Sequence, residues 1–258
     1  MDPILFELKD NIAFIRFNRP EKFNSFNREM ALLLQKYLDD CALNKEVRCV
    51  YITAIGKAFS AGQDIGELTG ENPVSFDKIL SEHFNPIIEK IRKLEKPVVC
   101  AVNGVAAGAG ANIALCCDII VASRSASFIQ AFSKIGLIPD SGGTYFLPRL
   151  IGFQKASAIA MLGDKISAPE AADMGMIYKY FEDDVFEKES LIIASTLAEL
   201  PTRGLAYTKE ALNQSLFNSL SDQLKLEDQL QFKCGHTNDY REGINAFTEK
   251  RKPSFTGK

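Results

Sequence analysis

Apolar residues recur along the first two thirds of the chain in short runs that predict β-strands. Ile12, Phe14 and Phe17 recur in the first of these runs, and the later runs are almost uninterrupted. Runs of this length, rich in β-branched and aromatic residues, are typical of strands buried in a sheet. The predicted strands cover residues 11–18, 48–55, 98–102 and 119–122.

Helical spacing of apolar residues appears between these strands. The segment from Met30 to Leu38 predicts one helix after the break at Arg19–Lys22, and residues 111–117 predict another between the last two strands. This succession of strand, strand and helix indicates a layered α/β core. The polar stretch Gly66–Ser75, which contains Gly70 and Pro73, predicts a loop that forms a mobile pocket wall.

The pattern changes after Glu199, where only helical spacing remains. One predicted apolar stripe consists of Leu205, Thr208, Ala211 and Leu212, and a second consists of Leu220, Leu224 and Leu230. We therefore expect a core over residues 1–199 and a helical module over residues 200–258.

Composition narrows the classes of function. The 258 residues have 46% hydrophobic content, enough for a sizeable core, and 30 basic and 33 acidic residues give a net charge of −3. This charge argues against nucleic acid or an anionic membrane as partner. The six cysteines lie mostly in apolar runs without CxxC spacing, which favours reduced core residues. Without a signal sequence or an apolar run of roughly 18 residues, a cytoplasmic location is expected.

Two loops with glycines follow predicted strands, at residues 57–64 and 103–112. The second opens an apolar helix, so its free N–H groups can meet developing negative charge. Together the loops predict a site where one N–H from each holds the oxygen of a carbonyl group that becomes an enolate. The alternative is that the glycines only permit tight turns.

The sequence lacks the complete motifs of dinucleotide-binding proteins, hydrolases and metal sites. Residues 108–113 begin like a dinucleotide fingerprint, but Ile113 stands where the third glycine or alanine belongs. The only histidines are His83 and His236, and no serine lies in a nucleophile elbow, which disfavours a hydrolase. No ligand cluster suggests a metal.

Several segments together resemble the enoyl-CoA hydratase/isomerase family, also called the crotonase family. They are residues 18–25, 58–64, 101–104, 142–144 and the C-terminal stretch 239–247. The resemblance covers nearly the whole chain. It implies a spiral of repeated strand, strand, helix units with a C-terminal helical trimerisation module. It also implies a homotrimer or dimer of trimers, an acyl-CoA thioester substrate, and no cofactor apart from the CoA of that substrate.

The same resemblance assigns the site residues. It places the oxyanion donors on the backbone N–H groups of Gln63 and Ala109. Ala61, Asp64 and Ile65 would line the CoA end. Basic and aromatic residues would hold the phosphates and adenine of CoA. Lys22 and Phe23 would come from the same chain, and Phe247 and Lys250 would come from a neighbouring subunit.

Acid and base groups separate the activities of the family. Hydratases use two glutamates, but this chain has Asn112 and Phe132 at those positions. What remains is Asp140, at a position where isomerases carry a lone carboxylate. A single base suits proton transfer between two carbons, and apolar neighbours such as Ile138 and Phe146 would raise its pKa. The alternative for Asp140 is a turn residue before Ser141-Gly142-Gly143.

Three hypotheses remain from the sequence. The first is an acyl-CoA isomerase, because residues 131–140, 104–111 and 250–258 look most like the phenylacetate-pathway members. These convert 1,2-epoxyphenylacetyl-CoA to oxepin-CoA, and related members shift double bonds of enoyl-CoA thioesters. The second is an enoyl-CoA hydratase. The third is a noncatalytic acyl-CoA-binding or assembly protein.

Overall fold

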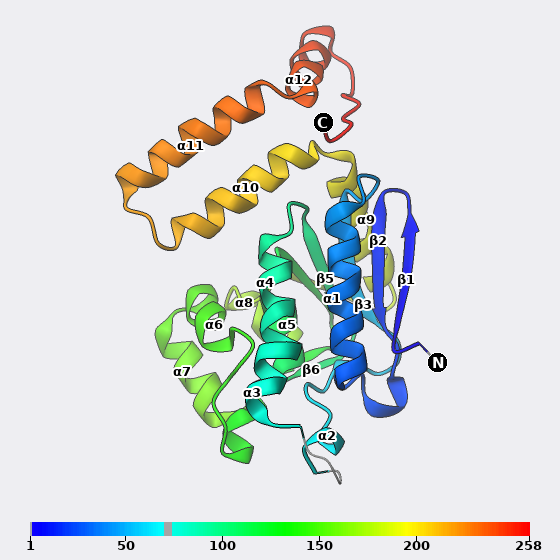
Figure 1. Ribbon diagram of the computed structural model, residues 1–258, viewed down its shortest axis with the longest axis vertical. Helices are drawn as coiled ribbons and strands as arrows, with labels where there is room; N and C mark the ends of the chain where they lie inside the picture. Colours follow the sequence, from blue (N-terminus) through cyan, green and yellow to red (C-terminus); the bar gives the residue numbers. More distant parts are fainter. Residues whose placement is uncertain (1, 70–73) are drawn as a thin grey trace.

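The computed structural model describes residues 2–69 and 74–258 and has an α/β architecture with two sheets (Figure 1). The larger sheet has the strand order β1-β2-β3-β5-β7-β10, and all its pairings are parallel except that of β1 with β2. Its strands are β1 (Ile4–Lys9), β2 (Ile12–Phe17), β3 (Cys49–Ala54), β5 (Val98–Val102), β7 (Ile119–Ser123) and β10 (Lys179–Phe181). The four strands predicted from the sequence form the middle of this sheet.

Strand β2 is buried on both faces of the sheet. Successive side chains of a strand point to opposite faces. Ala13 and Ile15 therefore join the main core, while Ile12 and Phe14 pack in a second cluster with side chains of helix α9 (Phe186–Glu199). Parallel sheets are usually covered on both faces, which explains why the central strands are almost entirely apolar.

The second sheet has the order β4-β6-β8-β9, with parallel pairs except for β8 with β9. Its strands are β4 (Ala58–Ser60), β6 (Val105–Ala107), β8 (Ser127–Ile129) and β9 (Lys165–Ser167). Strands β3, β5 and β7 are each followed by a strand of this sheet. The predicted succession of strand, strand and helix is thereby confirmed. One correction concerns the second glycine loop, because its residues 105–107 form β6 in parallel pairing with β4 and β8.

Helices cover the sheets (Figure 1). The predicted helices are present as α1 and α5, although α5 begins two residues earlier than predicted. Residues 66–69 were expected in a loop but form α2, whereas Gly70 and Pro73 lie outside the described residues. The helices up to α8 are α1 (Arg28–Leu43), α2 (Gly66–Thr69), α3 (Phe76–Lys78), α4 (Asn85–Lys93), α5 (Ala109–Leu115), α6 (Gly143–Ile151), α7 (Phe153–Leu162) and α8 (Ala168–Asp173). Short 3-10 helices cover Pro20–Lys22 and Ala131–Ile135, and a π-helix covers Ile79–Phe84.

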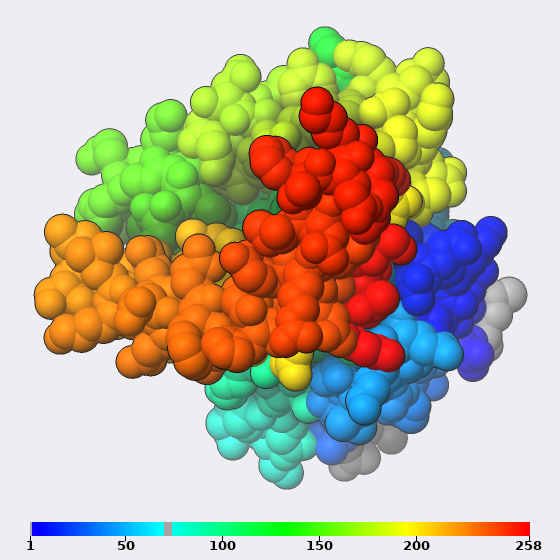
Figure 2. Space-filling view, turned by 90° about the horizontal axis from the view of Figure 1, so that it is seen from above, coloured from blue at the N-terminus to red at the C-terminus, as the bar shows by residue number. Residues whose placement is uncertain are grey.

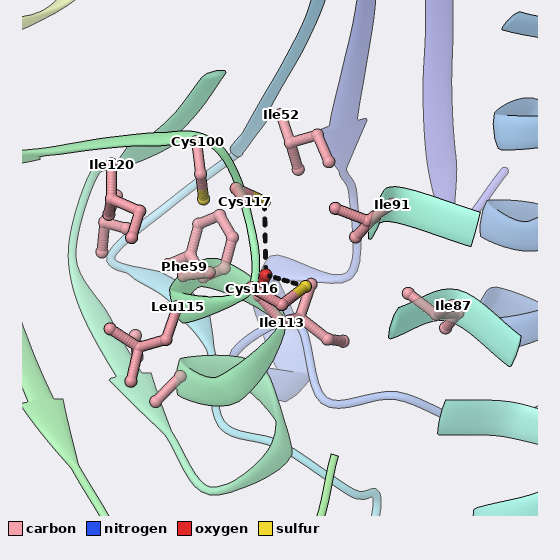
Figure 3. Close-up of a cluster of buried hydrophobic side chains, with 14 of the residues drawn as sticks. Ile52, Phe59, Ile87, Ile91, Cys100, Ile113, Leu115, Cys116, Cys117 and Ile120 are labelled. Atoms are coloured by element: carbon pink, nitrogen blue, oxygen red, sulfur yellow. Dashed lines mark hydrogen bonds between the residues drawn. The ribbon is translucent and has the colours of Figure 1, made fainter. Parts of the chain in front are cut away.

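The main core lies between the large sheet and helices α1, α4 and α5. Figure 3 shows cysteines among its aliphatic side chains, with the thiols of Cys116 and Cys117 donating to the carbonyl oxygen of Ile113 at 3.1 and 3.3 Å. Five of the six cysteines are buried and Cys234 is half-buried. Burial raises the pKa of the Cys100 and Cys116 thiols, so both stay protonated at neutral pH.

Three helices end the chain: α10 (Thr202–Ser215), α11 (Leu220–Gly235) and α12 (Asn238–Glu249). Helices α10 and α11 form an arm that projects from the body (Figure 1), and in the view from above α11 and the C-terminal residues lie across the front of the molecule (Figure 2). The ammonium group of Lys209 anchors α10, since it donates to Asp118 Oδ2 at 2.7 Å and to the carbonyl oxygen of Ile91 at 2.7 Å.

The predicted apolar stripes of this arm are only partly buried. In α10 the buried residues are Thr202, Ala206 and Lys209, whereas Leu212 is 63% exposed. In α11 Leu230 is buried, but Leu220 and Leu224 are exposed. The periodicity located the helices, but Lys209 and its partner Asp118 determine which face of α10 is covered.

Candidate active site

The first predicted loop holds Gln63 through backbone hydrogen bonds to Phe26. The N–H of Phe26 donates to the carbonyl oxygen of Gly62 at 2.7 Å, and the N–H of Asp64 donates to that of Phe26 at 2.8 Å. These bonds involve the residues on either side of Gln63. Its own N–H donates to no acceptor within residues 2–69 and 74–258.

The second loop presents the N–H of Ala109. Strand β6 ends at Ala107, and Gly108 turns the chain into α5 with a left-handed φ of +52°. The N–H of Gly108 donates to the carbonyl oxygen of Ile129 at 2.9 Å. Ala109 is the first residue of α5, so its N–H has no partner inside the helix, and none elsewhere in the described part of the chain.

Glycines bring the two loops into contact. A Cβ atom at Gly62 would lie 2.9 Å from the carbonyl oxygen of Ala107 and 3.4 Å from the backbone nitrogen of Ala109. Gly110 packs equally closely on β4, because a Cβ there would lie 2.6 Å from Cβ of Ser60. Only residues without a side chain permit this approach. The structure therefore brings together the backbone segments that carry the two predicted donors.

Asp140 lies against the same helix, α5. The side chain of Asn112 donates from Nδ2 to the carbonyl oxygen of Asp140 at 2.8 Å, and the N–H of Gly143 donates to the same oxygen at 2.8 Å. Ser141 and Gly142, with φ of +50° and +76°, make the left-handed turn that leads into α6. Asp140 is thus a turn residue, as the alternative held, and its turn is fixed to the helix that begins at Ala109.

The Asp140 carboxyl group is half-buried and has one neutral donor. Burial raises its pKa, and a 2.8 Å hydrogen bond from the Ser141 hydroxyl to Oδ1 opposes that shift. It forms no ion pair within the described residues. A half-buried carboxylate without a cation is a stronger base than an exposed one, which suits proton abstraction.

The residues at the two predicted glutamate positions present no acid group. Asn112 is completely buried, and its Oδ1 accepts a 2.7 Å hydrogen bond from Gln130 Nε2 while its Nδ2 binds Asp140. Phe132 is buried beside Gly108, where a Cβ atom would lie 3.7 Å from its ring. Asp140 is the only carboxylate among these three positions.

The loop that carries Asp140 forms one wall of an apolar cavity of about 400 Å³. Ile138 and Pro139 line it as expected, whereas Phe146 and Asp140 itself are not in the wall. The remaining lining residues come from the same loop and from α6 and α7, and include Leu137, Leu147, Phe153, Ala156 and Met161.

Four of the predicted CoA-contacting residues lie on two adjoining loops. The N–H of Ala61 donates to the carbonyl oxygen of Phe23 at 2.9 Å, which ties the first predicted loop to residues 22 and 23. Lys22, Phe23, Ala61 and Ile65 are exposed, with Phe23 at 58%. They form an open rim beside the two predicted donors.

Asp64 has a different setting. Its Oδ2 pairs with Arg19 Nη2 at 2.9 Å and its Oδ1 accepts from the N–H of Gly66 at 3.0 Å. Both oxygens are occupied by the protein, so Asp64 holds the loop and Arg19 in place. Phe247 and Lys250 are exposed on and after α12, which lies at the opposite end of the molecule from α2 (Figure 1). One chain does not bring them to the site.

The sequence interpretation missed the supporting residues Glu67 and Gln130. Glu67 Oε2 accepts from Gln63 Nε2 at 2.9 Å, and its Oε1 accepts from the N–H of Arg28 at the start of α1 at 2.7 Å. Its spacing of four from Gln63 was the available signal. Gln130 gave none, because its partner Asn112 is 18 positions away.

Residues 2–69 and 74–258 contain no group of three or more His, Cys, Asp or Glu side chains placed to hold a metal ion. Over the same ranges, no helix has the length and apolar character needed to cross a membrane.

The chain is similar in sequence and in fold to known proteins over nearly its whole length. The family model for enoyl-CoA hydratase/isomerase matches residues 7–258. The chain is 44% identical to 1,2-epoxyphenylacetyl-CoA isomerase of Escherichia coli, with 100% of both chains covered. It is 42% identical to a protein of Rhodobacter capsulatus named "probable enoyl-CoA hydratase", over 99% of this chain and 98% of that one. The crystal structure of enoyl-CoA hydratase from Bacillus anthracis superposes with a TM-score of 0.93 at 31% identity, covering 99% of this chain and 100% of that chain.

Proposed function

Because this chain belongs to the enoyl-CoA hydratase/isomerase family, we propose that it is an acyl-CoA isomerase with Asp140 as its single acid and base. The proposal rests chiefly on one observation. Asp140 is held against the helix that begins with the predicted oxyanion donor Ala109, and Asn112 and Phe132 are buried at the positions where the family resemblance predicts the glutamates of a hydratase.

The reaction follows from these groups. The thioester oxygen would lie between the N–H groups of Gln63 and Ala109. Asp140 would remove a proton from the carbon next to the carbonyl group, and the electron pair of that C–H bond would form an enolate stabilised by the two donors. Return of the proton from Asp140 to the carbon at the far end of the conjugated system would move the double bond and restore the carboxylate. Neither water nor a redox cofactor enters the balance.

The substrate class comes from the relatives. The 44% identity to 1,2-epoxyphenylacetyl-CoA isomerase supports a ring-epoxide thioester that rearranges to oxepin-CoA, and the same enolate chemistry would shift double bonds of enoyl-CoA thioesters. The hydratase name of the Rhodobacter capsulatus relative keeps water addition as the second candidate. CoA would enter only as part of the substrate.

We also propose that the protein assembles as a homotrimer or a dimer of trimers through residues 200–258. The support is the exposed apolar surface of the projecting arm, where Leu220 is 76% exposed and Phe232 is 70% exposed. Large apolar side chains gathered on one element mark interaction surfaces. Phe247 and Lys250 lie far from the CoA site of their own chain. In a trimer they would instead reach the CoA site of a neighbouring chain.

Parallel assays of the wild type and Asp140→Asn test the proposed activity. Each protein is given a 2-enoyl-CoA, a 3-enoyl-CoA and a ring-epoxide thioester, and products are identified by mass spectrometry in water enriched in ¹⁸O. We expect isomerisation without ¹⁸O in the product, and its loss in the variant at unchanged affinity for a saturated acyl-CoA. A hydroxyacyl product containing ¹⁸O would establish the hydratase instead. Binding without turnover of any of the three substrates would favour the noncatalytic alternative.

A further inference from the structure

Two buried amides form a hydrogen-bonded chain that ends on the backbone of Asp140. Gln130 follows β8 and is 2% exposed, and Asn112 in α5 is completely buried. Gln130 Nε2 donates to Asn112 Oδ1 at 2.7 Å, and Asn112 Nδ2 donates to the carbonyl oxygen of Asp140 at 2.8 Å. The rest of α5 has only Ala, Gly, Ile and Leu side chains, so Asn112 is its one polar side chain.

The direction of this chain is fixed by hydrogen-bond chemistry. The carbonyl oxygen of Asp140 can only accept, so Asn112 must turn its amide N–H₂ toward it. The Oδ1 of Asn112 is then left as an acceptor, and Gln130 must donate. As a result Gln130 Oε1 is buried without a partner within the described residues. A buried oxygen without a hydrogen-bond partner destabilises a fold. Asn112 and Gln130 therefore make the fold less stable than two apolar side chains at these positions would.

The segment from Asp140 to Gly143 is held firmly on α5. Gly143 sits on the Asn112 amide so closely that a Cβ atom would lie 2.9 Å from Asn112 Cγ. Asn112 is three residues after Ala109, which corresponds to a rise of about 4.5 Å along one helix. The same rigid element therefore carries one oxyanion donor at its first residue and the anchor of the base almost one turn later.

We propose that Asn112 and Gln130 are positioning residues that fix the Asp140 carboxylate relative to the oxyanion donor Ala109. This inference rests on the proposed isomerase function. It assigns to Asn112 a task unlike that of an acid or a water ligand, since both ends of its amide are used by the protein.

The first test removes the hydrogen bonds while keeping the volume. Asn112→Leu is expected to lower kcat by about tenfold to a hundredfold with little change in KM, because misplacement of a reacting group by about 1 Å costs up to about a hundredfold. Gln130→Met should have a smaller effect, and the double variant should match Asn112→Leu, because Gln130 acts through Asn112. Asn213→Leu is the matched control. Asn213 lies in α10, away from Asp140, and its side-chain amide likewise donates to a backbone carbonyl oxygen, that of Arg92 in α4, at 3.2 Å. It should lower Tm without lowering kcat.

A conservative variant adds a signature that loss of stability alone would not produce. Asn112→Asp offers no donor to the Asp140 carbonyl while the new carboxyl group is ionised, but it regains one when protonated. The ratio of its kcat to that of the wild type should therefore rise as pH falls. A ratio that is flat with pH would contradict the positioning role.

Titration of ¹³C-labelled aspartate by NMR gives a readout independent of turnover. In Asn112→Leu the Asp140 resonance should titrate closer to the ordinary aspartate pKa than in the wild type, because the loosened loop admits water. An unchanged titration, or wild-type kcat in Asn112→Leu beside an inactive Asp140→Asn, would overturn the inference and leave the isomerase function intact. A wild type that isomerises no substrate would instead refute the proposed function, while the NMR comparison would still decide whether the amide chain holds Asp140.

Discussion

Replacing Gly62 by alanine tests whether contact between the two loops creates the oxyanion site. The added Cβ would lie 2.9 Å from the carbonyl oxygen of Ala107, closer than real side chains approach, and 3.4 Å from the nitrogen of Ala109. Both obstacles are backbone atoms that cannot rotate away. One loop must move away from the other, and the Ala109 N–H moves with respect to that of Gln63.

Two effects contribute to the magnitude. Gly62 has a φ of +88°, and a side chain in this left-handed conformation costs about 1–2 kcal/mol. Overpacking against backbone adds about 1–3 kcal/mol, and each kcal/mol lowers the Tm of a chain of this size by about 2–4 °C. Loss of one oxyanion donor lowers kcat by about a hundredfold to a thousandfold in other enzymes. We expect a fall in kcat of about a hundredfold for Gly62→Ala.

Gly175→Ala provides the matched control for this experiment. Gly175 has a similar φ of +80°, but a Cβ there would meet only the carbonyl oxygen of Leu150 at an ordinary 3.6 Å. Steady-state kinetics and thermal unfolding should show lower stability in both variants but a lower kcat only in Gly62→Ala. A wild-type kcat in folded Gly62→Ala, or an equal loss in both variants, would refute the proposed geometry of the site.

Three further predictions concern the base and the assembly. Ser141→Ala removes the 2.8 Å hydrogen bond that lowers the Asp140 pKa, so the acid limb of the kcat/KM profile should move to higher pH; an unmoved limb would mean that another group controls it. Asp140→Asn should raise Tm at pH 7, because burial raises the folded-state pKa and the ionised form therefore destabilises the fold. This gain in Tm should shrink as pH falls through that raised pKa. Scanning calorimetry of both proteins at several pH values measures the Tm difference, and a difference that stays constant with pH would contradict the prediction. Phe232→Glu, on the exposed face of α11, should convert trimers to smaller species in light scattering, whereas an unchanged mass would place the interface elsewhere.

Much of the fold could be predicted because its signals are local. The central strands are nearly continuous apolar runs, and α1 has apolar residues at helical spacing after an Asn27 cap whose side chain accepts from the N–H of Met30 at 3.0 Å. Strand β6 was missed because it has only three residues inside a glycine-rich segment. Such a short strand is stabilised by its neighbours β4 and β8, and those pairings leave no periodicity in the sequence.

The candidate site also combines residues that lie in local motifs with contacts between residues that are far apart in the sequence. Gln63, Ala109 and Asp140 could be proposed as site residues because they stand in motifs with recognisable spacing. The Asn112 to Gln130 hydrogen bond and the ion pair of Arg19 with Asp64 join residues 18 and 45 positions apart. Only the tertiary structure determines such pairs. The buried Lys209 was unpredictable for a related reason, because a lysine is rarely buried unless a partner such as Asp118 compensates its charge.

In the proposed mechanism, Asp140 carries a proton from one carbon of the substrate to another through an enolate. The most direct test incubates a 3-enoyl-CoA with the wild type and Asp140→Asn in deuterated water, and follows bond migration and deuterium position by mass spectrometry and NMR. In the initial phase, before product returns to the enzyme, we expect migration with at most one deuterium, at the carbon that receives the proton, and neither migration nor exchange in the variant. Migration that continues at the wild-type rate in Asp140→Asn would contradict this mechanism.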